Sequence, residues 1–142
     1  AKASRFGIMN MDADVIVRDD LLRYIQEQLN KTHHKMMTAD DLSSNRTNGG
    51  LIFAQPSAIN ILRRWSDVMV PYCAAPLIDM RAFNDLRYNF TDVLQQVDLI
   101  PSDLVAMGGR PATYAGHYNG LGRTIDGKIE VMKQNHEWKI AL

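Results

Sequence analysis

IMNMDADVIVRDDLL, residues 8–22, is an apolar run interrupted by two carboxylates, and it decides how the rest of the chain is interpreted. The apolar residues before Asp12-Ala13-Asp14 indicate a strand that ends at the acidic turn, and residues 15–17 indicate a second short strand. Because side chains alternate along a strand, Asp12 and Asp14 are expected on the same face. Two adjacent carboxylates repel each other, and a divalent cation with oxygen ligands, Mn²⁺ or Mg²⁺, relieves that repulsion. The pattern therefore indicates a metal site, with a solvated turn between two strands as the simpler alternative.

The composition is that of one globular domain. The chain has 142 residues, 46% of them hydrophobic, and its 16 basic and 16 acidic residues give a formal net charge of zero. No basic stripe with interleaved aromatic residues occurs, which argues against nucleic acid as a partner. No apolar run approaches the roughly 20 residues that span a bilayer, so no membrane span is predicted. Cys73 is the single cysteine, which excludes an internal disulfide and argues against a cysteine-based zinc site.

Strands and helices are expected to alternate along the sequence. The first part predicts short buried strands at residues 6–9 and 15–17, a helix from Asp19 or Asp20 to about residue 29, and a polar loop with at most a short helical turn or strand at 30–47. The second part predicts a strand at 51–54, a helix starting at Pro56, a helix at 79–88, a strand at 97–101 and a helix at 125–134. This alternation is typical of an α/β fold with a mostly parallel sheet flanked by helices.

Apolar side chains at helical spacing predict which faces are buried. The helix that starts at Pro56 is expected to turn one face inward, with Ile59, Leu62, Trp65, Val68 and Met69. Phe83, Trp65 and Trp138 are interpreted as core residues. The glycine-rich segment 107–122 shows no regular periodicity, and His33-His34 are assigned to a loop.

The order of strand, Asp-x-Asp, apolar triplet and amphipathic helix resembles the nucleotide-sugar glycosyltransferases of the GT-A fold, which is related to the Rossmann fold. Four later segments are similar, in the same order, to the nucleotide-diphospho-sugar transferase family: NGGLIFAQPSAINILRRW at 48–65, DMRAFN at 79–84, GHYNG at 116–120 and GK at 127–128. The resemblance covers residues 6–138. It implies a GT-A-like domain.

The resemblance also implies roles for single residues. Asp12, Asp14 and His117 would hold Mn²⁺ (or Mg²⁺) against the diphosphate of the donor, and Asp79 would be catalytic, near the reacting sugar or the acceptor hydroxyl. The donor would further contact Ala13, Asn48, Gly49, Gly120 and Lys128. Several of these residues have a simpler interpretation: a surface or packing histidine at His117, a turn at Asn48-Gly49, a helix cap at Asp79 and a solvated lysine at Lys128.

The sequence departs from the family in two places. Met80 stands where the family has glutamine, next to Asp79. Relatives also place further βαβ units ahead of the Asp-x-Asp motif. Because Ala1 is not an initiator methionine and a strand follows almost at once, we interpret residues 1–142 as a single domain or fragment, the C-terminal part of a GT-A-like domain without its N-terminal nucleotide-binding half.

The function implied by the resemblance is metal-dependent transfer of a sugar from a nucleotide-sugar, specifically a UDP-sugar, to a carbohydrate or protein hydroxyl, with retention of configuration. One alternative is a truncated or degenerate transferase domain that acts as a non-catalytic binding or structural module. A second is a metal-dependent phosphohydrolase with Asp12 as the nucleophile. Acceptor patterns for N-glycosylation begin at Asn30, Asn45 and Asn89. They suit the Golgi lumen if the source is eukaryotic, and a prokaryotic or viral source implies the cytoplasm.

Overall fold

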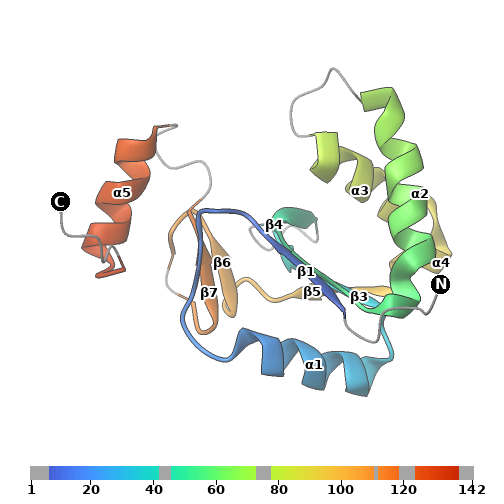
Figure 1. Ribbon diagram of the computed structural model, residues 1–142, viewed down its shortest axis with the longest axis horizontal. Coiled ribbons are helices and arrows are strands. Elements are labelled where there is room, and N and C mark those ends of the chain that lie inside the picture. The colour runs from blue at the N-terminus through green and yellow to red at the C-terminus, as the bar shows by residue number, and fades with distance from the viewer. Residues whose placement is uncertain (1–6, 42–45, 73–77, 111, 119–123, 138–142) are drawn as a thin grey trace.

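The computed structural model describes residues 7–41, 46–72, 78–110, 112–118 and 124–137. These residues form a mixed α/β fold with two small sheets (Figure 1). In spatial order, the first sheet contains β1 (Ile8–Met11), β4 (Thr47–Ala54), β3 (Met36–Asp40) and β5 (Val97–Ile100), and the second contains β2 (Val15–Val17), β7 (Ala115–His117) and β6 (Val105–Met107). The α-helices are α1 (Leu21–Thr32), α2 (Ile59–Met69), α3 (Ile78–Asn89), α4 (Thr91–Leu94) and α5 (Ile125–Gln134), and short 3₁₀ helices flank α2 at Pro56–Ala58 and Val70–Tyr72.

The prediction of a mostly parallel sheet is wrong. β4 runs antiparallel to both β1 and β3, and β7 runs antiparallel to β2. Only β3 with β5 and β6 with β7 are parallel among the described strands. The short connection between β3 and β4 imposes the antiparallel arrangement, because parallel neighbours need a longer crossover. β3 and its parallel neighbour β5 are separated in the chain by β4 and by the long segment that contains α2, α3 and α4.

The segment at 30–47, predicted as a polar loop with at most a short strand, contains a central strand of the first sheet. α1 continues to Thr32, and β3 then lies between β4 and β5. Met36, Met37 and Ala39 are buried there. A strand covered on both faces lacks the alternation of apolar and polar residues that marks a half-exposed strand, so its sequence signal is weak.

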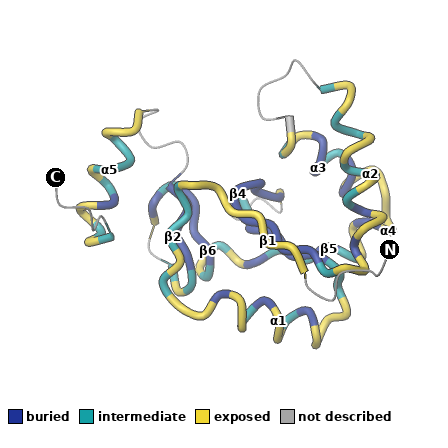
Figure 2. Tube along the Cα trace, viewed as in Figure 1, coloured by how far each residue is buried: buried dark blue, intermediate teal, exposed yellow. Residues whose placement is uncertain are grey.

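The predicted buried strand at 6–9 is also wrong in burial and partly in position. β1 spans Ile8–Met11, and all its residues are exposed (Figure 2); Ile8 is 63% exposed. Phe6 lies outside the described residues. β1 is the edge strand of its sheet and pairs with β4 alone, which explains the exposure.

Helices cover the two faces of the first sheet. On one face, Leu21, Ile25 and Leu29 of α1 pack in a cluster with residues of β3, β4, β6 and β7, so α1 covers both sheets. On the other face, residues of α2, α3 and α4 pack against β3, β4 and β5. The predicted helix positions are confirmed, and the side chain of Asp20 caps α1 by accepting from the amide of Arg23 at 3.1 Å.

The inward faces of the helices are confirmed in part. Phe83 is buried and packs edge-on against Trp65, with ring centroids 4.8 Å apart. Ile59 was predicted inward but is 48% exposed, because α2 begins after a 3₁₀ turn and directs Ile61 into the core instead. Trp138 lies outside the described residues.

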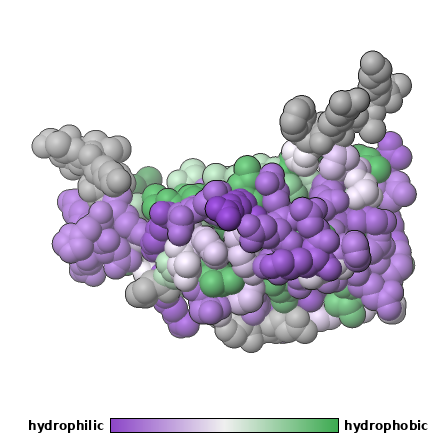
Figure 3. Space-filling model, turned by 90° about the horizontal axis from the view of Figure 1, so that it is seen from below, coloured by the Kyte–Doolittle hydropathy of each residue, from purple (hydrophilic) through white to green (hydrophobic). Residues whose placement is uncertain are grey.

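The outer surface on the α1 side is mostly hydrophilic. Figure 3 shows this face from below, with hydrophobic side chains in small separate patches. Such scattered patches are normal for a protein surface facing water. Among the described residues, no helix has the length and apolar character required to cross a membrane.

Candidate metal centre

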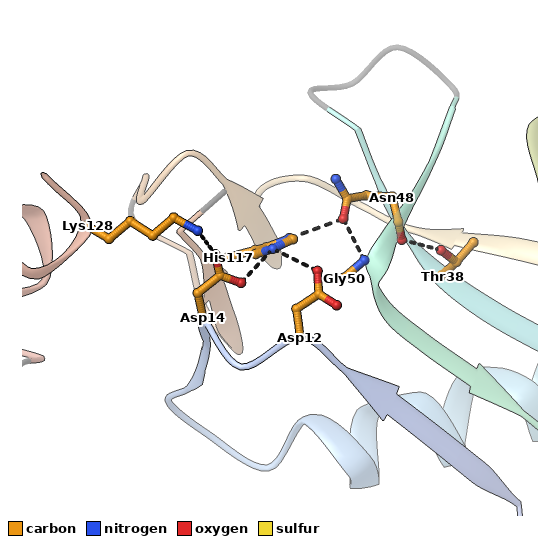
Figure 4. Close-up of polar contacts among 7 residues, drawn as sticks. All are labelled: Asp12, Asp14, Thr38, Asn48, Gly50, His117 and Lys128. Atoms are coloured by element: carbon orange, nitrogen blue, oxygen red, sulfur yellow. Dashed lines mark hydrogen bonds and ion pairs between the residues drawn. The ribbon is translucent and has the colours of Figure 1, made fainter. Parts of the chain in front are cut away.

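The structure brings together the three residues that the resemblance assigned to a metal. Nε2 of His117 lies 3.0 Å from Oδ1 of Asp14 and 3.4 Å from Oδ2 of Asp12 (Figure 4). One ligand atom from each residue lies within 4.8 Å of the other two. Two carboxylate oxygens and one imidazole nitrogen form a donor set that suits Mn²⁺, and their convergence from two sheets fits a single ion.

The Asp-x-Asp turn is attached to both sheets. The amide of Asp12 donates to the carbonyl of Gly50 in β4 at 2.9 Å, and the carbonyl of Asp14 accepts from the amide of Tyr118, just after β7, at 3.0 Å. Within the turn, Val15 donates to the carbonyl of Asp12 at 3.1 Å. The turn is only partly solvated, since the side chain of Asp12 is 53% exposed and that of Asp14 only 19%.

The imidazole of His117 is buried and lies directly over a glycine of β4. A Cβ placed on Gly50 would be 2.0 Å from Cε1 of His117, so a side chain there and the ring cannot coexist as they stand. Oδ1 of Asn48 accepts from the amide of Gly50 at 2.8 Å and lies 3.1 Å from Nδ1 of His117. The sequence signal for this role of Gly50 is a glycine inside a buried strand, which often marks a close approach of another group.

Charge around Asp14 favours its ionised form. Burial raises the pKa of this carboxyl, but the hydrogen bond from Lys128 and the electrostatic interactions with His117 and Lys128 outweigh burial, so the pKa of Asp14 lies below its usual value. Nζ of Lys128 contacts Oδ2 of Asp14, while Oδ1 of Asp14 faces His117. Lys128, predicted to contact the donor, thus lies beside the candidate metal centre and is paired with Asp14.

Polar contacts at the C-terminal end of α5 hold this helix next to the second sheet. Glu137 contacts both the hydroxyl of Tyr118 and the guanidinium of Arg18. Nδ2 of Asn135 donates to the Tyr118 hydroxyl and to the carbonyl of Gly109, each at 2.9 Å. These contacts join the end of α5 to the second sheet, and Lys128 of the same helix contacts Asp14.

A cleft of about 560 Å³ opens between the Asp-x-Asp turn and α5. Its lining residues are Asp12, Ala13, Asp14, Ile125, Lys128, Ile129 and Met132. The carboxylates of the turn therefore face Lys128 and the apolar side chains of the helix across the cleft. Ala13, predicted to contact the donor, lies in this lining; Gly120 lies outside the described residues.

Asp79 lies on the other side of β4 from His117. Its Oδ2 is 2.9 Å from the position of a Cβ on Gly49, and Cγ of Met80 is 3.2 Å from it. Asp79 is in the first turn of α3, and its carbonyl accepts from Nε1 of Trp65 at 3.0 Å. The Gly49-Gly50 backbone therefore separates the predicted catalytic carboxylate from the imidazole, and Asp79 is not part of the Asp12–Asp14–His117 group.

Replacing Lys128 by Met is expected to destabilise the metal-free protein at pH 7 by about 1 kcal/mol, because the ionised Asp14 loses its partner. In the wild type, the lowered pKa of Asp14 stabilises the fold above about pH 4, and this contribution disappears as the pH falls through the folded-state pKa. The stability difference between the two proteins should therefore shrink below about pH 4. Urea unfolding from pH 7 to pH 3 measures it, with the exposed Lys133→Met on the same helix as the control. A difference that stays constant across this range would contradict the assignment.

The fold and the site together define a mixed α/β protein with a candidate Asp-Asp-His metal centre beside a lysine-bearing cleft. No protein-family model matches the sequence, and no curated protein matches it either.

Proposed function

We propose that the chain is the metal-binding part of a GT-A-like glycosyltransferase that moves a sugar from a nucleotide-sugar, specifically a UDP-sugar, to a carbohydrate or protein hydroxyl. The observation that carries the proposal is the convergence of Asp12, Asp14 and His117 with Lys128 at the edge of the same cleft. A donor diphosphate needs positive charge where its leaving oxygen develops negative charge. A cation held by Asp12, Asp14 and His117, together with Lys128, would supply that positive charge.

The residues of the cluster divide that task between them. Asp12, Asp14 and His117 would hold Mn²⁺ (or Mg²⁺), and the bound ion supplies positive charge to the leaving diphosphate. Lys128 pairs with Asp14 in the metal-free protein. Once the carboxylate of Asp14 coordinates the ion, Lys128 lies close enough to the ion to bind an oxygen of the diphosphate. Apolar side chains of α5 line the same cleft, beside the position proposed for the phosphates.

Asn48, Gly49 and Gly120 complete the donor contacts that the resemblance assigns. The side chain of Asn48 lies on the His117 side of β4, whereas Gly49 faces Asp79 and Met80. Asp79 would orient the sugar or the acceptor hydroxyl. Retention of configuration follows from the family resemblance.

Met80 supports one alternative, a degenerate domain that binds without catalysis. Its side chain lies beside Gly49, where the family resemblance expects a glutamine. A thioether is only a weak hydrogen-bond acceptor and cannot donate, so a sugar loses one polar contact there.

The test is the release of nucleoside diphosphate from a panel of UDP- and GDP-sugars by the complete natural protein, with and without Mn²⁺. We expect release from UDP-sugars that depends on Mn²⁺, stops with chelator and returns when Mn²⁺ is added back. Asp19→Asn, an exposed carboxylate outside the cluster, is the matched control and should keep full activity. Mn²⁺ binding without turnover would support the non-catalytic alternative, and a protein that neither binds Mn²⁺ nor turns over would contradict both.

A further inference from the structure

We propose that Asn48 is a positioning residue for His117: its side-chain oxygen accepts the N–H at Nδ1, so that Nε2, which faces Asp12 and Asp14, is the nitrogen that binds the ion. The inference rests on the proposed metal site, and it gives Asn48 a role in addition to the donor contact that the resemblance implies. It follows from hydrogen-bond chemistry at three residues: Asn48, Gly50 and His117.

The orientation of the Asn48 amide is set by a backbone group. The amide nitrogen of Gly50 can only donate, and its partner at 2.8 Å is an atom of the Asn48 side chain. That atom must accept, so it is the oxygen Oδ1, and turning the amide over would place two donors against each other. The orientation therefore follows from the chemistry of Gly50 and needs no assumption about His117.

The tautomer of the imidazole follows from that orientation. Nδ1 of His117 lies 3.1 Å from the same oxygen. Because an amide oxygen accepts and does not donate, Nδ1 must carry a proton to form this bond. The other ring nitrogen, Nε2, lies 3.0 Å from Oδ1 of Asp14 and 3.4 Å from Oδ2 of Asp12. Nε2 is therefore the nitrogen that would bind an ion held by these carboxylates, while Nδ1 keeps its N–H bonded to Asn48.

Asn48 is held so that it can impose this choice. Its side chain is buried, and its carbonyl accepts from Oγ1 of Thr38 at 2.9 Å, next to an irregularity in the pairing of β3 with β4 (Figure 4). Its Nδ2 is buried and has no hydrogen-bond partner among the described residues. The amide is thus oriented for Gly50 and His117 at the expense of its own donor.

This arrangement matches how proteins prepare histidine for metals. A ligating histidine usually donates its second N–H to a carbonyl or carboxylate, and loss of that partner lowers metal affinity by about 10- to 100-fold. A purely packing role would be restored by any side chain of similar volume, whereas the proposed role requires a hydrogen-bond acceptor at position 48. The difference in metal affinity between an accepting and a non-accepting side chain is therefore the decisive observable.

The test measures the ¹⁵N chemical shifts of the His117 ring in the protein loaded with Mg²⁺, which is diamagnetic, and the Kd for Mn²⁺ by calorimetry and electron paramagnetic resonance. With Mg²⁺ bound, the wild type should show Nδ1 protonated and Nε2 unprotonated and bound to the ion. Asn48→Asp keeps the accepting oxygen and should keep the tautomer and a Kd within a few-fold. Asn48→Leu has similar volume and no acceptor, and its Kd should rise by about 10- to 100-fold.

Several outcomes would overturn the inference. A wild-type ring that binds the ion through Nδ1, or that stays protonated on Nε2 when Mg²⁺ is bound, refutes it without any variant, so a misfolded Asn48→Leu protein does not leave it untested. Asn48→Leu with unchanged Mn²⁺ affinity also refutes it. Neither measurement involves sugar transfer, so an inactive protein that shows the expected tautomer and Kd values would contradict the proposed function and leave this inference standing.

Discussion

Replacing Asp14 by Asn is expected to abolish measurable Mn²⁺ binding, with a rise in Kd of at least about 100-fold, or about 2.8 kcal/mol. Asp14 is the more enclosed of the two carboxylates, and its oxygens face His117 and Lys128 separately. The amide removes the negative charge and places an NH₂ group, which cannot coordinate a cation, against one of these two partners. Metal binding then depends on the more exposed Asp12 and the imidazole alone.

Calorimetric titration with Mn²⁺ measures this effect, and Asp19→Asn controls for the loss of one negative charge in the same region. The metal-free Asp14→Asn protein should remain folded by circular dichroism, because an amide still accepts from Lys128 through its oxygen. Under the proposed function, Mn²⁺-dependent release of UDP should also fall to background. Unchanged Mn²⁺ affinity in this variant would remove Asp14 from the centre.

Replacing Gly50 by Ala is expected to have a comparable effect without changing any charge. The added Cβ would lie 2.0, 2.3 and 2.8 Å from Cε1, Nδ1 and Nε2 of His117, so the ring must leave its position. The backbone at Gly50 does not require positive φ, and the effect is therefore steric. We expect Mn²⁺ binding to fall at least about 100-fold and the free energy of unfolding to fall by about 1–3 kcal/mol, as in other overpacked sites.

Gly49→Ala is the matched comparison, because it adds the same methyl group to the neighbouring residue. That methyl meets the flexible ends of Asp79 and Met80 and does not face His117. Gly49→Ala should therefore keep Mn²⁺ affinity, and under the proposed function it should lower sugar transfer. Equal Mn²⁺ affinity in the two alanine variants, measured by the same titration, would show that the imidazole does not depend on Gly50.

Local sequence signals were sufficient for the helices and for part of the site. The apolar spacing of Leu21, Ile25 and Leu29 and the cap at Asp20 locate α1, because these features act within a few residues. The two carboxylates at 12 and 14 were recognisable from their interruption of an apolar run. His117 entered through the family resemblance, and its place beside them depends on contacts between distant parts of the chain.

The sheet and the surroundings of the imidazole could not be predicted in the same way. Alternating strands and helices do not reveal whether neighbours in space run parallel, and the strands of the second sheet have only three residues each, too few for a periodic signal. The contact of Asn48 with His117 spans 69 positions, and nothing near either residue indicates the other. A glycine is needed at position 50 because the ring of His117, also distant in the sequence, occupies the space that a side chain would fill.

The position of the acidic turn between two separate sheets has a mechanical consequence. Asp12 follows β1 of the first sheet, whereas His117 ends β7 of the second, and Lys128 on α5 reaches Asp14 across 114 positions of the chain. An ion bound at this junction would act as a crosslink between two halves that otherwise share mainly the apolar contacts under α1. Binding of a cation would then stabilise the whole molecule against unfolding. Its removal would allow each sheet to fluctuate or unfold separately.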